Sequence, residues 1–149
     1  RLTIGYALIF CHHFAILVVV MFTLGTAPTP TMLLAIPALA IVAAAGAGLG
    51  LTLAILGARY RDLQPAMAVA MALLFIFSPV MWKAEQLQVN EWVLRFNPFY
   101  YYLSLVRDPL LGHAPSEVAW ISTGLGAAAL LAIGYITLLL SRRRLFHWL

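Results

Sequence analysis

The feature that most constrains this chain is a long stretch without formal charge. None of the 57 residues between Arg1 and Arg59 is Asp, Glu, Lys or Arg. A helix needs only about 20 consecutive, mostly apolar residues to cross the hydrocarbon core of a bilayer. The stretch is therefore long enough for two membrane-spanning helices with a turn between them.

The composition of the whole chain excludes several classes of protein. Hydrophobic residues make up 64% of the sequence and charged residues only 9%, whereas a soluble domain carries about 25% charged residues. The single cysteine, Cys11, excludes a disulfide-stapled secreted domain, and the apolar content excludes a disordered tail. We therefore predict an all-α integral membrane protein in which residues 1–149 form a single membrane domain.

Apolar segments separated by turn-forming or charged residues predict four transmembrane helices. We expect them at residues 4–24, 32–57, 66–82 and 118–140. The first segment lacks the basic start and small-residue cleavage site of a signal peptide. Pro65 is well placed to begin the third span, and Pro79 is expected to kink or end it. Four spans place both ends of the chain on the same side of the membrane.

The distribution of basic residues predicts which side that is. Cytoplasmic loops of membrane proteins carry an excess of Lys and Arg, so we interpret the net charge of +4 as a signal of orientation and not of nucleic-acid binding. In the cell (inner, cytoplasmic) membrane, the loop 58–65, the tail 141–149 and both chain ends are expected in the cytoplasm, and residues 83–117 outside. Arg1, Arg59, Arg61, Arg142, Arg143 and Arg144 lie on the first side, and Lys83, Arg95 and Arg107 on the second.

The outer connection, residues 83–117, is too apolar for a solvated loop, and its apolar segments are too short to cross the bilayer. We expect two short helices, roughly residues 90–96 and 98–111, broken at Asn97-Pro98. Such segments can dip into the outer leaflet and return only where protein or a water-filled cavity shields their backbone. The pattern thus predicts a re-entrant helical hairpin beside a partner surface or a conduit.

A dense set of aromatic residues near the outer boundary has two interpretations. Aromatic belts anchor membrane proteins in the headgroup layer, but aromatic faces also offer apolar area and hydroxyl partners on which sugar rings can stack. The candidates for a substrate path at the outer mouth are Trp82, Phe96, Phe99, Tyr100, Tyr101 and Tyr102.

Glycines and histidines in the first two spans also allow two interpretations each. Gly46 and Gly50 form a GxxxG pattern that Gly57 continues, which suits close helix packing within this subunit or against a second copy. His12 and His13 are ionisable residues in a span, which indicates either hydrogen-bonded neutral side chains or a haem or metal ligand. Adjacent helical residues point about 100° apart, so the two rings are unsuited to chelating one ion, and we predict no metal site.

Catalysis by this chain itself has little support in the sequence. No carboxylate lies in a predicted span to relay protons, and the serines lack a recognisable nucleophile context. No GxxxxGK[ST] phosphate loop is present. We therefore expect no enzyme activity and no cofactor in this chain; if ATP drives transport, ATP and Mg²⁺ bind a partner ATPase.

The order of motifs resembles that of the permease subunits of ABC exporters for bacterial surface polysaccharides, which include O-antigen, capsule and teichoic acid exporters. The motifs are Gly57-Ala-Arg-Tyr-Arg-Asp-Leu63, Ser78-Pro-Val-Met-Trp82, Phe96-Asn-Pro-Phe-Tyr-Tyr101, Val106-Arg-Asp-Pro-Leu-Leu-Gly112 and the terminal Arg-Arg-Arg-Leu-Phe-His-Trp-Leu. Phe10-Cys-His-His-Phe14 is similar to a segment in the family's third span, but His13 stands where the family commonly has Asn. The resemblance implies that this chain supplies the C-terminal four of six spans.

The resemblance also implies partners and a mechanism. A homodimer of permeases would work with two copies of an ABC ATPase subunit and move a lipid-linked glycan between membrane lipids, without nucleic acid. Coupling to the ATPase would involve Arg59, Tyr60, Arg61 and Asp62, although two arginines at the end of a span also serve simply as topology signals or lipid-phosphate partners. Two alternatives stay open: an intramembrane haem or metal redox protein that uses His12 or His13, and a membrane scaffold that transports nothing.

Overall fold

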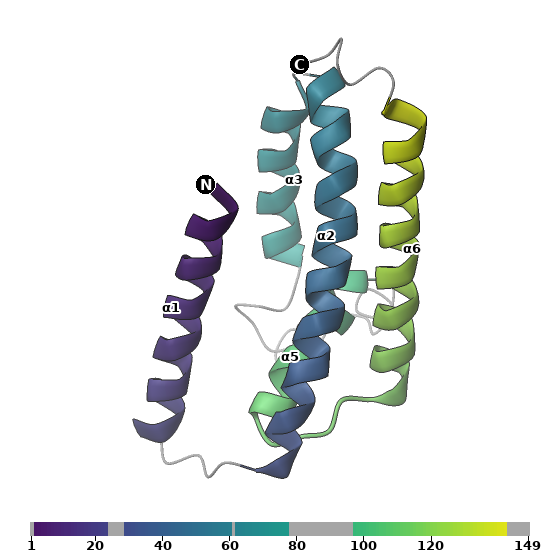
Figure 1. The fold of residues 1–149 in the computed structure, drawn as a ribbon. Coiled ribbons are helices and arrows are strands. Elements are labelled where there is room, and N and C mark those ends of the chain that lie inside the picture. The colour runs from purple at the N-terminus through teal and green to yellow at the C-terminus, as the bar shows by residue number, and fades with distance from the viewer. Residues whose placement is uncertain (1, 24–28, 61, 78–96, 143–149) are drawn as a thin grey trace. The chain divides into compact units, whose positions relative to one another are not determined.

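The computed structural model describes residues 2–23, 29–60, 62–77 and 97–142, and every regular element within those ranges is a helix. The chain divides into two compact units, Arg1–Pro30 and Thr31–Leu149, which are described separately. The first unit holds α1 (Leu2–Thr23), and the second holds the helices α2, α3, α5 and α6 (Figure 1). A short 3₁₀ helix, η1 (Pro30–Leu34), leads directly into α2.

Helix α1 coincides with the first predicted span. Between residues 8 and 20 its exposed side chains include apolar ones on every turn, such as Leu8, Phe14 and Val19. A helix that is apolar on all sides needs lipid or other helices around it. Phe10 and Phe14, one turn apart, stack with their ring centroids 6.2 Å apart.

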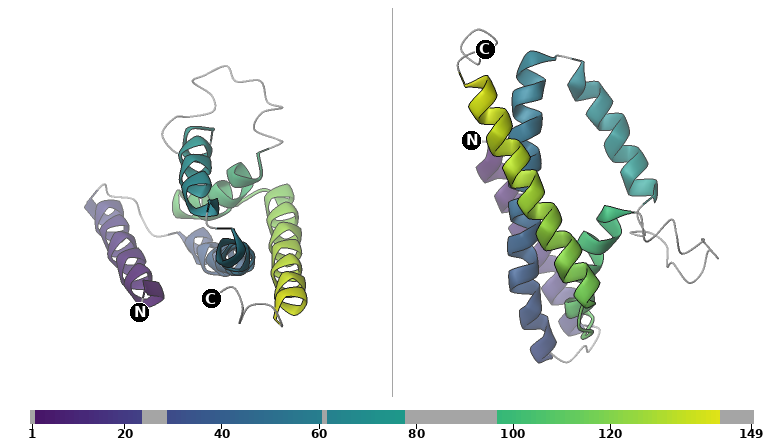
Figure 2. Two further views of the ribbon diagram at one scale, coloured as in Figure 1. Left: turned by 90° about the horizontal axis from the view of Figure 1, so that it is seen from above. Right: turned by 90° about the vertical axis from the view of Figure 1, so that its right-hand side faces the viewer.

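Helix α2 (Ala35–Arg59) is the centre of the second unit, because α3, α5 and α6 all contact it (Figure 2). Its buried residues lie on one stripe, as helical spacing requires, and they are mostly small: Ala35, Ala38, Ala45, Gly48 and Ile55. The small side chains allow a neighbouring helix to approach the α2 backbone closely.

Helix α6 (Glu117–Ser141) is that neighbour. It begins where the Ser116 hydroxyl accepts a hydrogen bond from the Ala119 N–H at 3.2 Å, and Glu117 lies in the positively polarised first turn. At its crossing with α2, a Cβ on Gly48 would lie 2.5 Å from the Leu130 backbone, and one on Gly134 would lie 2.7 Å from the Gly48 carbonyl oxygen. Only glycine allows this backbone contact, so the pair fixes the crossing point of the two long helices.

Helix α3 (Leu63–Phe77) follows α2 after a tight turn in which the Leu63 N–H donates to the Tyr60 carbonyl. It begins three residues before the predicted start, so Pro65 lies at its third position and not at its first. Proline is tolerated there because the first N–H groups of a helix have no intrahelical acceptor. The predicted end of this span, with Pro79 and Trp82, lies outside the described residues.

Helix α5 (Pro98–Leu110) confirms the second predicted short helix almost to the residue. The Asn97 side chain accepts from the Phe99 N–H at 3.0 Å, and Pro98 occupies the first helical position. The helix ends in a Schellman motif: Gly112 adopts a φ of 85°, its N–H donates to the Pro109 carbonyl, and the His113 N–H donates to the Asp108 carbonyl. The first predicted short helix, 90–96, lies outside the described residues.

Two of the helices are long and apolar enough to cross a membrane, counted over the described residues: Pro30–Arg59, which joins η1 to α2, and Glu117–Ser141. They correspond to the predicted spans 32–57 and 118–140. The apolar segments Leu8–Met21 and Leu63–Leu74 are shorter. The all-helical class is thus supported, whereas the first and third spans and the re-entrant hairpin stay predictions.

Candidate functional site

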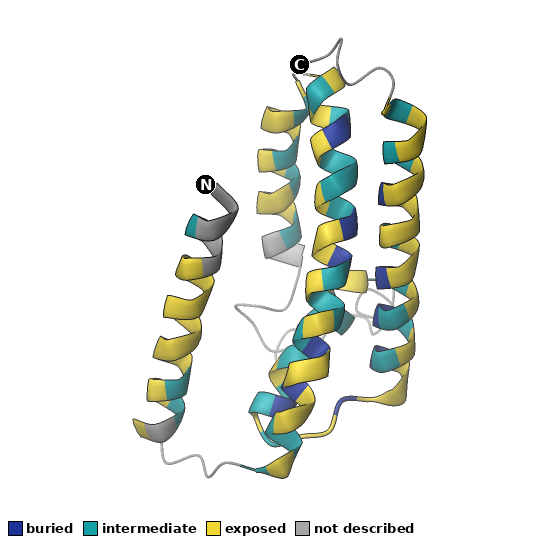
Figure 3. Cartoon of the chain, in the orientation of Figure 1, coloured by how far each residue is buried: buried dark blue, intermediate teal, exposed yellow. Residues whose placement is uncertain are grey.

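The candidate site is built on α5, which packs against the N-terminal halves of α2 and α6. Leu105 is fully buried and forms a small apolar cluster with Ala38 of α2 and Ala119 of α6. Tyr101 and Trp120 pack at the edge of this cluster. Figure 3 shows that buried residues of α2 and α6 face each other along this part of the second unit. The contacts place α5 at the end of α2 and α6 that is opposite to Arg59 and Arg142.

Tyr102 makes the polar contact between α5 and α6. Its hydroxyl donates to the Thr123 carbonyl oxygen at 3.1 Å. The Tyr102 hydroxyl oxygen also lies close to Gly126: a Cβ on that glycine would be 2.7 Å from it. Burial raises the pKa of the Tyr102 phenol above its ordinary value.

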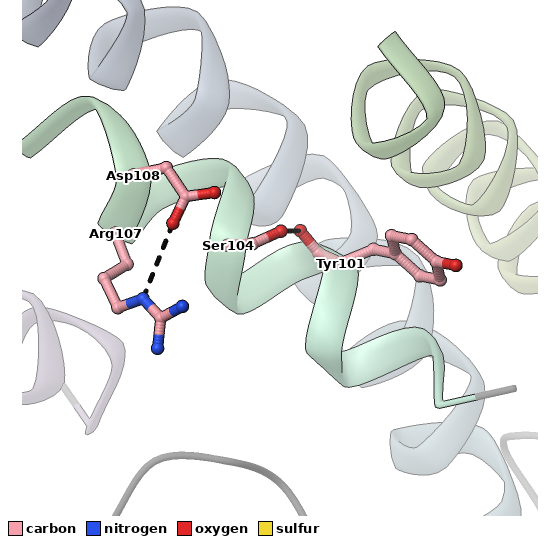
Figure 4. Close-up of polar contacts among 4 residues, drawn as sticks. All are labelled: Tyr101, Ser104, Arg107 and Asp108. Carbon is pink, nitrogen blue, oxygen red and sulfur yellow. Dashed lines mark hydrogen bonds and ion pairs between the residues drawn. The ribbon is translucent and has the colours of Figure 1, made fainter. Parts of the chain in front are cut away.

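Accessible side chains of α5 lie on its flank and on the side away from Leu105. Phe99 and Arg107 are exposed, and Tyr100 is half-buried, with its ring in a T-shaped contact with that of Tyr101 at a centroid distance of 5.5 Å. The Arg107 Nε lies 3.5 Å from an Asp108 carboxylate oxygen, and its two terminal nitrogens point away from that carboxylate (Figure 4). These side chains therefore combine aromatic area with one cation.

The loop between α2 and α3 forms the second charged feature. The Arg59 guanidinium carbon lies 5.1 Å from the centre of the Tyr60 ring, a cation–π arrangement. Asp62 is exposed and immediately precedes α3. Next to the loop, an open and largely apolar groove of about 330 Å³ separates the two helices; it is lined by Gly50, Leu53, Ala54, Gly57, Leu63, Gln64 and Met67.

Residues 2–111 match the family model of the ABC-2 type transporter. The chain belongs to this family. Neither the search of curated proteins nor the search of solved structures found a match. The matched region includes α1 to α3 and the whole of α5, so both charged features of the permease lie within it.

The structure separates the predicted aromatic set of the ABC-2 permease into parts. Tyr101 packs against the apolar cluster and Tyr102 is hydrogen-bonded to α6, whereas Phe99 is exposed. Tyr100 is half-buried, as the other two tyrosines are. Trp82 and Phe96 lie outside the described residues, as does Arg61 of the predicted coupling set. A role of any of these residues in transport or coupling stays a prediction.

The glycines of the predicted packing motif lie away from the crossing of α2 and α6. A Cβ at Gly46, Gly50 or Gly57 would meet nothing within 4 Å, and Gly50 and Gly57 line the groove beside α3. The close contact is made by Gly48, which lies between Gly46 and Gly50 and is not one of the two glycines of the GxxxG pattern. Packing of the three glycines against a second copy stays a prediction.

His12 and His13 lie on α1 with their rings nearly perpendicular and 5.9 Å apart. One ring nitrogen of His13, Nδ1, lies 2.7 Å from the Ile9 carbonyl oxygen one turn earlier. Within the described ranges, no three His, Cys, Asp or Glu side chains gather as a metal site would require. The geometry therefore shows His13 in a local backbone contact.

Sequence reasoning missed Thr123 and Gly126, the partners of Tyr102. A signal for them was present, because Ala119, Thr123 and Ala127 recur every four residues and mark a small-residue face on α6. The sequence did not indicate which helix would pack on that face.

Proposed function

We propose that this ABC-2 permease exports a lipid-linked polysaccharide of the O-antigen, capsule or teichoic acid type across the cytoplasmic membrane. Two copies of the permease would act with two ABC ATPase subunits, which bind and hydrolyse ATP with Mg²⁺. Family membership supports the transport function and an ATPase partner. It also favours this function over a redox protein or a scaffold.

The observation that carries the proposed substrate class is the aromatic face of α5. A short helix packed against both long helices presents Phe99 and Tyr100 on its accessible side, with Arg107 nearby. Aromatic rings give sugars a flat apolar surface, and a guanidinium suits the phosphate groups of a lipid carrier. Both chemistries are needed to conduct a glycan that is linked to lipid through phosphate.

The positions of the charges support the proposed orientation. Arg59 ends α2 and Arg142 follows α6 at one end of the second unit, whereas α5 packs at the other end. The positive-inside rule assigns the first end to the cytoplasm, where ATPase subunits act. The aromatic face of α5 then lies at the outer mouth, where the glycan leaves.

Export from proteoliposomes tests this proposal. The permease is co-reconstituted with its ATPase partner, and transport of a synthetic lipid-diphosphate oligosaccharide is measured for Phe99→Ala and Tyr100→Ala. Loss of one stacking contact of about 1 kcal/mol should reduce the apparent affinity about fivefold. Tyr135→Ala is the matched control, because Tyr135 is exposed on α6. Transport that is equal in all three variants would contradict the proposed glycan contact.

A further inference from the structure

We propose that Tyr102 is a positioning residue that holds α5 against α6. Its hydroxyl is hydrogen-bonded to the Thr123 carbonyl and occupies the space left by the missing side chain of Gly126. The inference rests on the proposed function only for its consequence, the placement of Phe99 and Tyr100 in the glycan path. We call the arrangement the Tyr102 lock; it consists of the Tyr102 hydroxyl, the Thr123 carbonyl oxygen and the bare Cα of Gly126. Tyr102 would thus act through its neighbours, without contacting the glycan.

The lock depends on the hydroxyl and not only on the ring. Thr123 is fully buried inside α6, and its carbonyl oxygen receives the Tyr102 hydroxyl as a donor from another helix. The Thr123 hydroxyl already donates to the Ala119 carbonyl at 2.6 Å, one turn earlier in α6. The hydrogen bond between the two helices at Thr123 therefore comes from the Tyr102 hydroxyl of α5.

The lock also depends on the absence of a side chain at position 126. An ideal Cβ there would lie 2.7 Å from the Tyr102 hydroxyl oxygen, a distance that real Cβ contacts essentially never show. The same Cβ would lie 3.7 Å from the ring carbon Cζ, which is ordinary van der Waals contact. An alanine at position 126 thus excludes the hydroxyl but accommodates the ring.

A second contact between α5 and α6 restricts the rotation of α5 about its own axis. Leu105, three residues after Tyr102, belongs to the cluster with Ala119, four residues before Thr123. The reversed order shows that α5 runs antiparallel to this part of α6. Two contacts on one face fix the rotation of α5 about its axis. Helical spacing then directs Tyr100 to the opposite side and Phe99 to the flank next to Tyr102.

Three variants of the full permease with its ATPase partner test the lock: Tyr102→Phe, Gly126→Ala and the double variant. Tyr102→Phe loses one hydrogen bond, and we expect the half-saturating concentration of the lipid-diphosphate oligosaccharide to rise about fivefold, with a smaller change in maximal export rate. Gly126→Ala requires the hydroxyl to shift away from α6, and it should raise the half-saturating concentration by about the same factor, because the same hydrogen bond is lost. The double variant should show no loss beyond that of Tyr102→Phe, because without the hydroxyl the new Cβ meets only the ring, at ordinary van der Waals distance.

The thermal midpoint of the purified permease in detergent is measured alongside export and should show the same pattern across the three variants. Gly124→Ala is the matched control, because a Cβ there meets nothing within 4 Å; it should leave both readouts near wild type. If the double variant is worse than Gly126→Ala in both readouts, the lock is wrong. If this pattern is seen in the thermal midpoint but no variant exports the glycan, the lock stands and the proposed function falls.

Discussion

The two ends of the second unit differ in how tightly their helices meet. At the aromatic end, where α5 packs on α2 and α6, the cluster of Ala38, Leu105 and Ala119 is buried and the Tyr102 hydroxyl is hydrogen-bonded across helices. At the basic end, the loop at Arg59 to Asp62 lies beside an open groove between α2 and α3. Packed cores resist small displacements, whereas open grooves permit them.

This difference suggests a division of roles. Under the proposed function, a signal from the ATPase would reach the permease at the basic end, beside the open groove between α2 and α3. The aromatic end is built to keep α5 in one orientation. The following substitutions test the division, ordered from the largest expected effect to the smallest.

Leu105→Ala should be the most damaging change at the aromatic end. The side chain is fully buried between α2 and α6, and truncation of such a leucine costs about 2–5 kcal/mol through lost contacts and the cavity left behind. The unfolding free energy of the purified permease measures this loss. Leu125→Ala is the control, since Leu125 is exposed on α6. Equal losses for both variants would mean that α5 does not pack as described.

Gly48→Ala should disturb the crossing of α2 and α6. The new Cβ would lie 2.5 Å from the Leu130 backbone, which cannot yield as a flexible side chain can. Overpacking of this kind costs about 1–3 kcal/mol. Gly46→Ala, two residues away and with open space at its Cβ, should be neutral or slightly stabilising because alanine favours the helix. Thermal unfolding of the two variants under identical conditions distinguishes them.

Asp62→Asn should affect coupling and leave the aromatic end intact. Asn caps a helix as well as Asp does, so α3 should still begin at Leu63, but the negative charge is lost. We expect export per ATP hydrolysed to fall about tenfold, equivalent to about 1.4 kcal/mol. Glu117→Gln removes a charge at the other end of the unit and should leave the ratio unchanged. A normal ratio in Asp62→Asn would contradict a coupling role for this residue.

The regular elements could be predicted because each is encoded locally. Unbroken apolar runs set the two long helices: residues 32–57 and 118–140 were predicted, and α2 with η1 and α6 cover them. The pair Asn97-Pro98 likewise determined the start of α5. Some bounds shifted by a few residues, since proline at the third position of α3 is as acceptable as at the first.

The contacts between helices could not be predicted in the same way. The pattern of Gly46 and Gly50 identifies a helix that can pack closely, but the rotation of α2 that brings Gly48 against α6 depends on the partner. Tyr102 and Thr123 are 21 residues apart in sequence, so the spacing of residues within either helix does not predict that they pair. The aromatic set was therefore predicted as a group, whereas its division into packed and accessible rings required the tertiary structure.

Gly112→Ala should have the smallest effect of the series. It tests the turn that ends α5. Gly112 has a φ of 85°, and its N–H and that of His113 satisfy the last carbonyls of α5. A Cβ in this conformation costs about 1–2 kcal/mol, partly offset by the lower entropy of the unfolded alanine chain, so we expect a net loss of about 1 kcal/mol in unfolding free energy. Gly112→Asn should lose less, because asparagine tolerates the left-handed region better than alanine.

The comparison of these two variants separates conformational strain from loss of space. Both substitutions add a Cβ, and asparagine is the larger residue, so a steric effect would make Gly112→Asn worse than Gly112→Ala. A conformational effect gives the opposite order. Because the turn after α5 leads through the buried Pro115 to the start of α6, strain at Gly112 should also weaken the Tyr102 lock. Under the proposed function, the loss in glycan affinity should then follow the loss in stability across the two variants, whereas export per ATP, which we propose depends on the basic end, should not change.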